Sequence, residues 1–122
     1  MDKETCVNKA FEIIGYGGDA KGRAYEALEL AENGDFEGAH REMEDVAETM
    51  VKAHNIQTEF IVKAAQGEEI PMDILFVHSQ DHLMCGIEAE ALIAHLITAN
   101  ERIARLEERI AALEGARGSD AA

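Results

Sequence analysis

Histidine and aspartate residues spaced three and four apart make segment 76–84 the part of the chain best suited to chemistry. His78, Asp81 and His82 fall within one helical turn, because residues at these spacings share a face of a helix. A neutral imidazole can attack a phosphoryl group, so His78 is the candidate nucleophile, with His82 and Gln80 in supporting roles. Such chemistry depends on positioning and charge stabilisation more than on a deep pocket.

Two other interpretations of the same cluster stay open. Two histidines one turn apart can chelate a divalent ion, with Asp81 as a hard oxygen ligand. Alternatively, the histidines are hydrogen-bonded packing residues, since polar groups buried in a helical core must be paired. Among the other histidines, we expect His40 on a polar surface and His54 and His95 in partly buried packing positions.

Composition narrows the class of protein that carries this cluster. The 122 residues include 11 Lys and Arg against 25 Asp and Glu, which gives a formal net charge of −14. That charge repels nucleic acid and anionic lipid, and no local basic patch is evident. Apolar runs are far shorter than the ~18–20 residues that span a bilayer, so we expect a cytoplasmic protein without direct membrane insertion. Cys6 and Cys85 lack the spacing of a redox or metal motif and are expected to stay reduced.

The elements that must position the cluster are helices. The chain is rich in good helix formers and contains one proline, Pro71, which predicts an all-α fold. We expect helices at about 3–32, 36–66 and 71–114, with Pro71 in the first turn of the third. Short connections predict an antiparallel three-helix bundle that forms a single domain over 1–114, followed by a flexible tail at 115–122. One stripe of the second helix is expected to face the core: Ala39, Met43, Val46, Met50, Ala53 and Gln57.

The third predicted helix also carries an unbroken alternation of four-residue and three-residue spacings, which is typical of a coiled-coil seam. The members of this seam are His78, His82, Cys85, Ala89, Leu92, Leu96, Ala99, Ile103, Leu106, Ile110 and Leu113. Because this helix is longer than the two before it, its end must overhang the bundle. An exposed Ile and Leu stripe there favours aggregation unless another copy covers it. We therefore expect a homo-oligomer in which the long C-terminal helix extends as a coiled coil.

Short segments follow one another in a fixed order along the chain: AFEII (10–14), GDAK (18–21), EAL (26–28), AENGDF (31–36), AHNIQT (53–58), GEEIP (67–71) and HSQDHLM (78–84). In type, order and spacing they resemble the lactose/cellobiose-type enzyme IIA components of the bacterial phosphoenolpyruvate-dependent sugar phosphotransferase system. The resemblance covers roughly residues 5–100, and the last segment is its most specific part.

The resemblance implies a three-helix protomer that assembles as a homotrimer, with its helices in a nine-helix bundle. His78 matches the family's phosphorylated histidine, which accepts phosphate from the histidine-containing phosphocarrier protein and passes it to a cysteine of enzyme IIB during sugar uptake. Asp81 matches an aspartate near the threefold axis, where three copies are associated with one divalent ion, such as magnesium, per trimer. His82 and Gln80 match positions that line the same site.

Two features depart from the family pattern. Ser79 stands where family members often have Ala or Gly, and segment 101–113 is longer and more regular than the family implies. Three carboxylates at the Asp81 position would repel one another at pH 7 unless a cation or protonation neutralised them, and we expect the cation. Two rival classes remain: a non-catalytic trimeric helical scaffold and a di-histidine metal-binding protein.

Overall fold

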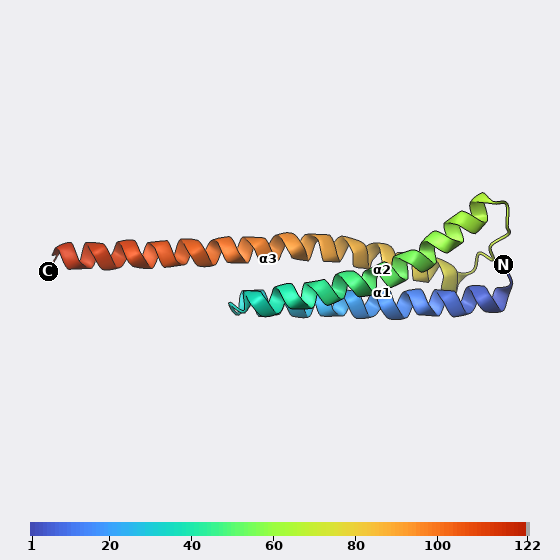
Figure 1. Ribbon diagram of the computed structural model, residues 1–122, viewed down its shortest axis with the longest axis horizontal. Coiled ribbons are helices and arrows are strands. Elements are labelled where there is room, and N and C mark those ends of the chain that lie inside the picture. Colours follow the sequence, from blue (N-terminus) through green and yellow to red (C-terminus); the bar gives the residue numbers. More distant parts are fainter. Residues whose placement is uncertain (122) are drawn as a thin grey trace.

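Three helices make up the part of the chain that the structure describes. The computed structural model describes the backbone of residues 1–121 and the side chains of residues 1–119. The helices are α1 (Lys3–Glu32), α2 (Phe36–Ala65) and α3 (Ile74–Ala121), and the described residues include no strand. Figure 1 shows that α2 runs back along α1 and that α3 then follows the direction of α1. The expected all-α, three-helix arrangement is confirmed.

Short polar side chains fix where each helix begins. The carboxylates of Asp2 and Asp35 accept hydrogen bonds from the backbone N–H groups of the residues three positions later. Asp73 does the same for α3, accepting from the N–H of Phe76 at 2.9 Å. This cap makes α3 begin at Ile74, so the prediction of Pro71 in its first turn is wrong. The α1–α2 and α2–α3 connections contain Gly34 and Gly67 at φ 86° and 88°, a conformation that glycine adopts without strain.

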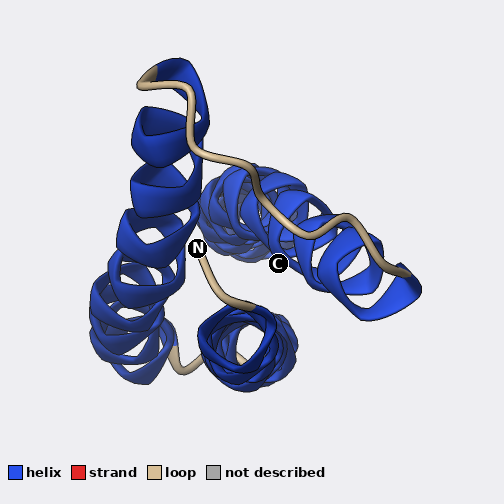
Figure 2. Ribbon diagram, turned by 90° about the vertical axis from the view of Figure 1, so that its right-hand side faces the viewer, coloured by secondary structure: helices blue, strands red, loops and turns tan. Residues whose placement is uncertain are grey.

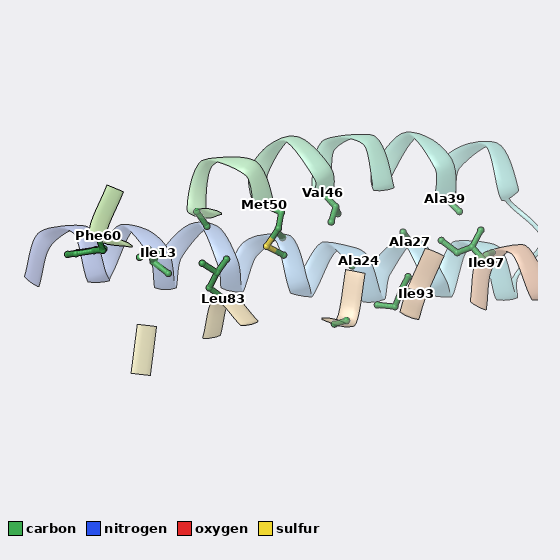
Figure 3. Close-up of a cluster of buried hydrophobic side chains, with 14 of the residues drawn as sticks. Ile13, Ala24, Ala27, Ala39, Val46, Met50, Phe60, Leu83, Ile93 and Ile97 are labelled. Atoms are coloured by element: carbon green, nitrogen blue, oxygen red, sulfur yellow. The ribbon is translucent and has the colours of Figure 1, made fainter. Parts of the chain in front are cut away.

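Small residues on α1 allow the other helices to pack closely against it. The buried face of α1 is mostly alanine, and larger side chains from α2 and α3 fill the space above it (Figure 3). Helix α3 passes close to α1 at Gly17, where an added Cβ would lie 3.7 Å from the Cα of Leu83. On α2, the predicted core stripe is confirmed for Ala39, Val46, Met50 and Ala53, while Met43 and Gln57 are half-buried. The ring of Phe60, further along α2, meets Phe76 of α3 edge to face, with ring centroids 5.0 Å apart.

The long helix α3 has two apolar faces with different surroundings. The buried face contributes Phe76, Leu83, Ile93 and Ile97 to the core. The predicted coiled-coil seam lies on the adjacent face, about 100° around the helix axis: Leu92 is 55% exposed, whereas its neighbour Ile93 is 2% exposed. Most of the seam is therefore accessible in the single protomer, although Ala89 is buried and His82 half-buried.

Helix α3 also continues well past the bundle. Among the described residues, the polar contact with another helix that lies furthest along α3 joins His40 Nε2 of α2 to Glu101 Oε1 at 2.7 Å. The helix then runs on to Ala121 (Figure 1). The flexible tail predicted at 115–122 is thus helical over 115–121, and residue 122 lies outside the described residues. The helix persists because alanine, arginine and glutamate favour it, and Gly115 and Gly118 are weaker breakers than proline.

By length and composition alone, part of α3 (Ile74–Ser119) is apolar enough to cross a membrane. A helix that supplies core residues on one face and an exposed apolar stripe on the other passes the same test. Helix α3 has this two-faced pattern.

Candidate functional site

The histidine cluster lies in the first turns of α3. His78 is exposed and His82 half-buried, and their rings meet edge to face with centroids 4.6 Å apart. Asp81 is also exposed, and its Oδ1 accepts a weak hydrogen bond from the Sγ of Cys85 at 3.7 Å. The structure therefore brings His78, Asp81 and His82 together on one accessible face, as the spacing predicts.

The opposite side of the same turns holds this face in place. Ser79 is fully buried, and its hydroxyl donates a hydrogen bond of 2.6 Å to the backbone carbonyl of Phe76. Leu83 is fully buried against α1 beside Gly17, and Phe76 packs on Phe60 of α2. Because core contacts surround the histidines on the same rigid helix, their backbone has little freedom to move. The imidazole of His78 therefore projects from a backbone that the core contacts hold in place.

The side chain of Gln80 points toward α2 and not toward His78. Its Oε1 accepts a hydrogen bond of 2.8 Å from Nε2 of Gln57 on α2, and its own Nε2 lies 3.4 Å from the Ser79 hydroxyl. Residues two apart on an α-helix are separated by about 200° around its axis, so Gln80 and His78 of one protomer face different directions. The structure does not bring these two side chains together.

An apolar groove of about 220 Å³ lies between the C-terminal part of α2 and the start of α3. The apolar sequence neighbours Phe76, Leu83 and Met84 predict that His78 lies in a shallow apolar groove between helices, but His78 does not line this one. The lining residues are Phe60, Ile61, Ala64, Ile70, Met72, Phe76 and Gln80. Figure 2 shows the α2–α3 connection looping across this end of the molecule, between the tips of the two helices.

Exposed apolar side chains accompany the histidines, and the sequence reasoning missed them. Met72, Ile74 and Val77 are exposed beside the cluster, and Ile74 reaches 83% exposure. The available signal was that they fall outside both the core face and the seam of α3.

The other histidines lie outside this cluster. His40 is exposed, as predicted, and pairs with Glu101. His54 and His95 are exposed rather than partly buried, because each is one or two residues past a core position and so points away from it. His54 lines a second groove of about 290 Å³ with Glu90, whose pKa is raised by burial.

Two thiols and one carboxylate are the remaining candidate ligands or nucleophiles. Both cysteines are free, as expected. Burial raises the pKa of the Cys6 thiol, which donates to the carbonyl of Pro71 at 3.6 Å, so this thiol stays protonated. Among the described residues no three His, Cys, Asp or Glu side chains converge as a metal site.

Comparisons with known proteins agree with this geometry. Residues 8–101 match the family described as "PTS system, Lactose/Cellobiose specific IIA subunit". The chain is 39% identical over 105 residues to the lactose-specific EIIA component of the PTS system of Lactococcus lactis, covering 86% of this chain and 100% of the relative. It is 42% identical over 93 residues to the lichenan-specific phosphotransferase enzyme IIA component of Bacillus subtilis, covering 76% and 84% of the two chains.

Solved structures show the same fold. The PTS cellobiose-specific enzyme IIA of Bacillus anthracis superposes with a TM-score of 0.80 at 32% identity, covering 86% of this chain and 94% of that one. The IIA(Chitobiose) protein of the Escherichia coli phosphotransferase system, solved in complex with HPr, gives a TM-score of 0.68 at 33% identity, covering 84% and 97%. The matched family segment contains the whole histidine cluster of α3, and the chain belongs to the lactose/cellobiose-specific IIA family of the sugar phosphotransferase system.

Proposed function

We propose that this protein is a cytoplasmic phosphoryl carrier in sugar uptake that holds the phosphoryl group on His78. The observation that carries the proposal is the exposed imidazole of His78 on a helix fixed by buried neighbours. The donor is HPr, the histidine-containing phosphocarrier protein, and a relative of similar fold has been solved in complex with HPr. The acceptor is a cysteine of enzyme IIB.

Each transfer exchanges one bond to phosphorus for another. In the first step a neutral nitrogen of His78 attacks the phosphorus of the donor's phosphohistidine, so that a new P–N bond forms as the donor's P–N bond breaks. In the second step the cysteine thiolate of enzyme IIB attacks, forming a P–S bond and releasing His78 as neutral imidazole. His82, with its ring centroid 4.6 Å from that of His78, would donate a hydrogen bond to the phosphoryl oxygens.

Docking of a protein partner completes this site. The exposed apolar side chains Met72, Ile74 and Val77 would be covered by the partner, which would exclude water from the reacting groups. The net charge of −14 favours a partner that presents a basic face. Because no enclosed pocket is needed, a shallow exposed site suits a carrier that meets two proteins in turn. Such a carrier has no need to insert into the membrane.

The working form in this proposal is a homotrimer with a nine-helix bundle, continued by a coiled coil of the α3 extensions. The exposed seam of α3 supports it, because Leu92 and Leu96 are each about half accessible in the protomer. Burying this stripe between copies removes an apolar surface that water disfavours. In such an assembly a supporting role for Gln80 would act across a subunit boundary, because it faces away from His78 of its own chain.

The proposal includes one magnesium ion per trimer at Asp81. The carboxylate fits this role because it is exposed, lies on the seam side of α3 beside Cys85, and supplies the hard oxygen donors that magnesium prefers. When bound, the cation would neutralise the repulsion among three copies of the carboxylate. Metal analysis of wild type against Asp81→Ala tests this part, with Glu44→Ala on the surface of α2 as the control. Equal metal content in wild type and Asp81→Ala excludes Asp81 as a ligand.

Phosphorylation assays test the carrier function directly. The protein is incubated with labelled phosphoenolpyruvate, the general phosphotransfer enzyme of the system and HPr, and the label is then mapped. We expect acid-labile, base-stable label that is lost in His78→Ala and kept in His95→Ala, an exposed histidine on the same helix. Absence of label from the wild type would remove the carrier function and leave a helical scaffold as the remaining interpretation.

A further inference from the structure

The extension of α3 is the largest feature that the carrier function leaves unexplained. Residues 102–121 lie beyond the segment matched by the family and beyond the His40–Glu101 contact. They continue the helix by about 30 Å at ~1.5 Å per residue. Four large apolar residues of this extension are each at least half exposed: Ile103, Leu106, Ile110 and Leu113. Their spacing of three, four and three forms one continuous stripe with Leu92 and Leu96 of the seam.

Charged residues on either side of this stripe follow the heptad. With isoleucine at a positions 103 and 110 and leucine at d positions 106 and 113, the g residues that precede the two isoleucines are arginine, at 102 and 109. Both e positions that follow are glutamate, at 107 and 114. All four side chains are exposed in the protomer, and a cavity of about 230 Å³ is lined by Arg102, Arg105, Leu106 and Arg109 on the arginine side.

This charge pattern selects one orientation of two associating helices. In a parallel, in-register pair, each g residue faces the e residue five positions later in the next helix, so arginine would meet glutamate at both levels. In an antiparallel pair, g faces g and e faces e, so arginine would meet arginine and glutamate would meet glutamate. Only the parallel, in-register pair gives opposite charges throughout.

We propose that residues 102–114 form a parallel, in-register coiled coil with the same segment of other copies, closed by ion pairs of Arg102 with Glu107 and of Arg109 with Glu114 in the neighbouring copy. The proposal rests on the self-association in the proposed function and adds the direction and register of the chains. Isoleucine at a and leucine at d favour two strands when a coiled coil stands alone. The body of the protein therefore sets the number of copies at three, and the extension sets their alignment.

Cysteine cross-linking in the full-length protein tests direction and register. Cys85 is replaced by serine, the buried Cys6 is kept, and a single cysteine is placed at d position 113 by Leu113→Cys. We expect rapid disulfide formation between copies, because parallel in-register d residues face one another. The matched control Ala112→Cys, one position off the stripe, should cross-link at least tenfold more slowly. Equal rates at the two positions, or no cross-link at 113, would overturn the proposal.

Charge reversal in the cross-linkable protein tests the ion pairs. Arg102→Glu with Arg109→Glu places glutamate against glutamate and should slow cross-linking at 113 at least tenfold. Adding Glu107→Arg and Glu114→Arg should restore the rate, because opposite charges then meet again. If the variant with all four substitutions cross-links as slowly as the variant with only the two arginines replaced, the proposed ion pairs are refuted.

Molecular mass and His78 labelling, measured on the same samples, separate this proposal from the carrier function. A labelled trimer without the 113 cross-link refutes the coiled coil alone. A cross-linked protein without label refutes the carrier alone. A labelled monomer refutes both the trimer and its coiled coil.

Discussion

Adjacent residues on α3 should respond in opposite ways to the same substitution. Ile93 is 2% exposed in the core between the helices, whereas Leu92 is 55% exposed on the seam. Ile93→Ala removes core packing and should cost about 2–5 kcal/mol of protomer stability. At roughly 4 °C per kcal/mol for a chain of this size, the melting temperature should fall by roughly 8–20 °C. This loss should not depend on protein concentration beyond the dependence that the wild type shows.

Leu92→Ala should act on assembly instead. Full burial of a leucine side chain stabilises by about 1.5–3 kcal/mol, and about half of Leu92 is already covered in the protomer, which leaves about 1 kcal/mol per copy for the interface. Over the three copies of the proposed trimer this amounts to about 3 kcal/mol, or roughly a hundredfold in the dissociation constant. The loss should therefore appear as dissociation on dilution, with a small change in the stability of the protomer.

Two measurements on each variant separate these effects. Light scattering across a dilution series reports the mass, and thermal unfolding followed by circular dichroism at two concentrations reports stability. If Leu92→Ala melts as far below wild type as Ile93→Ala at every concentration, while its mass is unchanged, Leu92 belongs to the protomer core. The assignment of two separate faces to α3 would then be wrong.

Three further substitutions probe the packing around the site. Ser79→Ala should change the free energy of unfolding by less than about 0.5 kcal/mol, because the lost hydroxyl hydrogen bond is offset by the better helix propensity of alanine. His78 labelling should stay intact. Denaturant titrations measure the free energy of unfolding. Gly86→Val should lower the melting temperature by at least about 5 °C, because even a Cβ there would lie 3.1 Å from the Met50 methyl and 3.4 Å from the Gly17 carbonyl, and valine adds two more methyl groups. Burial raises the pKa of the Glu90 carboxyl in the folded protein. The folded state therefore binds more protons than the unfolded state at intermediate pH. The free energy of unfolding should fall as the pH rises from about 4.3, the pKa of the unfolded chain, through the raised pKa of the folded protein. Glu90→Gln should therefore stabilise the protein slightly at pH 7 and have no such effect at pH 4; an equal gain at both pH values would contradict this explanation.

Local signals predicted the first two helices because their ends are fixed by nearby residues. Asn33-Gly34 and Gly67 end helices wherever the rest of the chain packs, and the structure places the ends of α1 and α2 within one residue of prediction. The start of α3 was misplaced because Asp73 caps the helix after Pro71, and a proline near a helix start does not by itself identify the first turn. The same limit explains why residues 115–121 are helical instead of forming a flexible tail. Gly115 and Gly118 weaken a helix but do not by themselves end it.

The sequence predicts which residues form the candidate site, but only part of their arrangement in space. Spacing alone places His78, Asp81 and His82 on one face, and the structure agrees. Periodicity could not decide which apolar face of α3 packs against α1, because the helix carries two such stripes on adjacent faces, one residue out of phase. That choice depends on the small residues of α1, which accept Leu83 beside Gly17. Once this face is fixed, the direction of Gln80 toward α2 follows.

A continuous α3 connects the alignment of the chains to the geometry of the site. The helix runs from the histidine cluster to the extension without a proline, so a shift between copies at Ile103 is transmitted to His78, about 38 Å away at ~1.5 Å per residue. A slip of one heptad would move each histidine by about 10 Å relative to its counterparts and would separate the three Asp81 carboxylates. Ile and Leu layers alone tolerate such a slip, since they repeat every seven residues. Arg102 and Arg109 penalise it, because a shift by one heptad leaves one arginine and one glutamate of each pair of chains without a partner. In the proposed assembly, the charged flanks of the extension would therefore keep the His78 side chains of all copies at the same level.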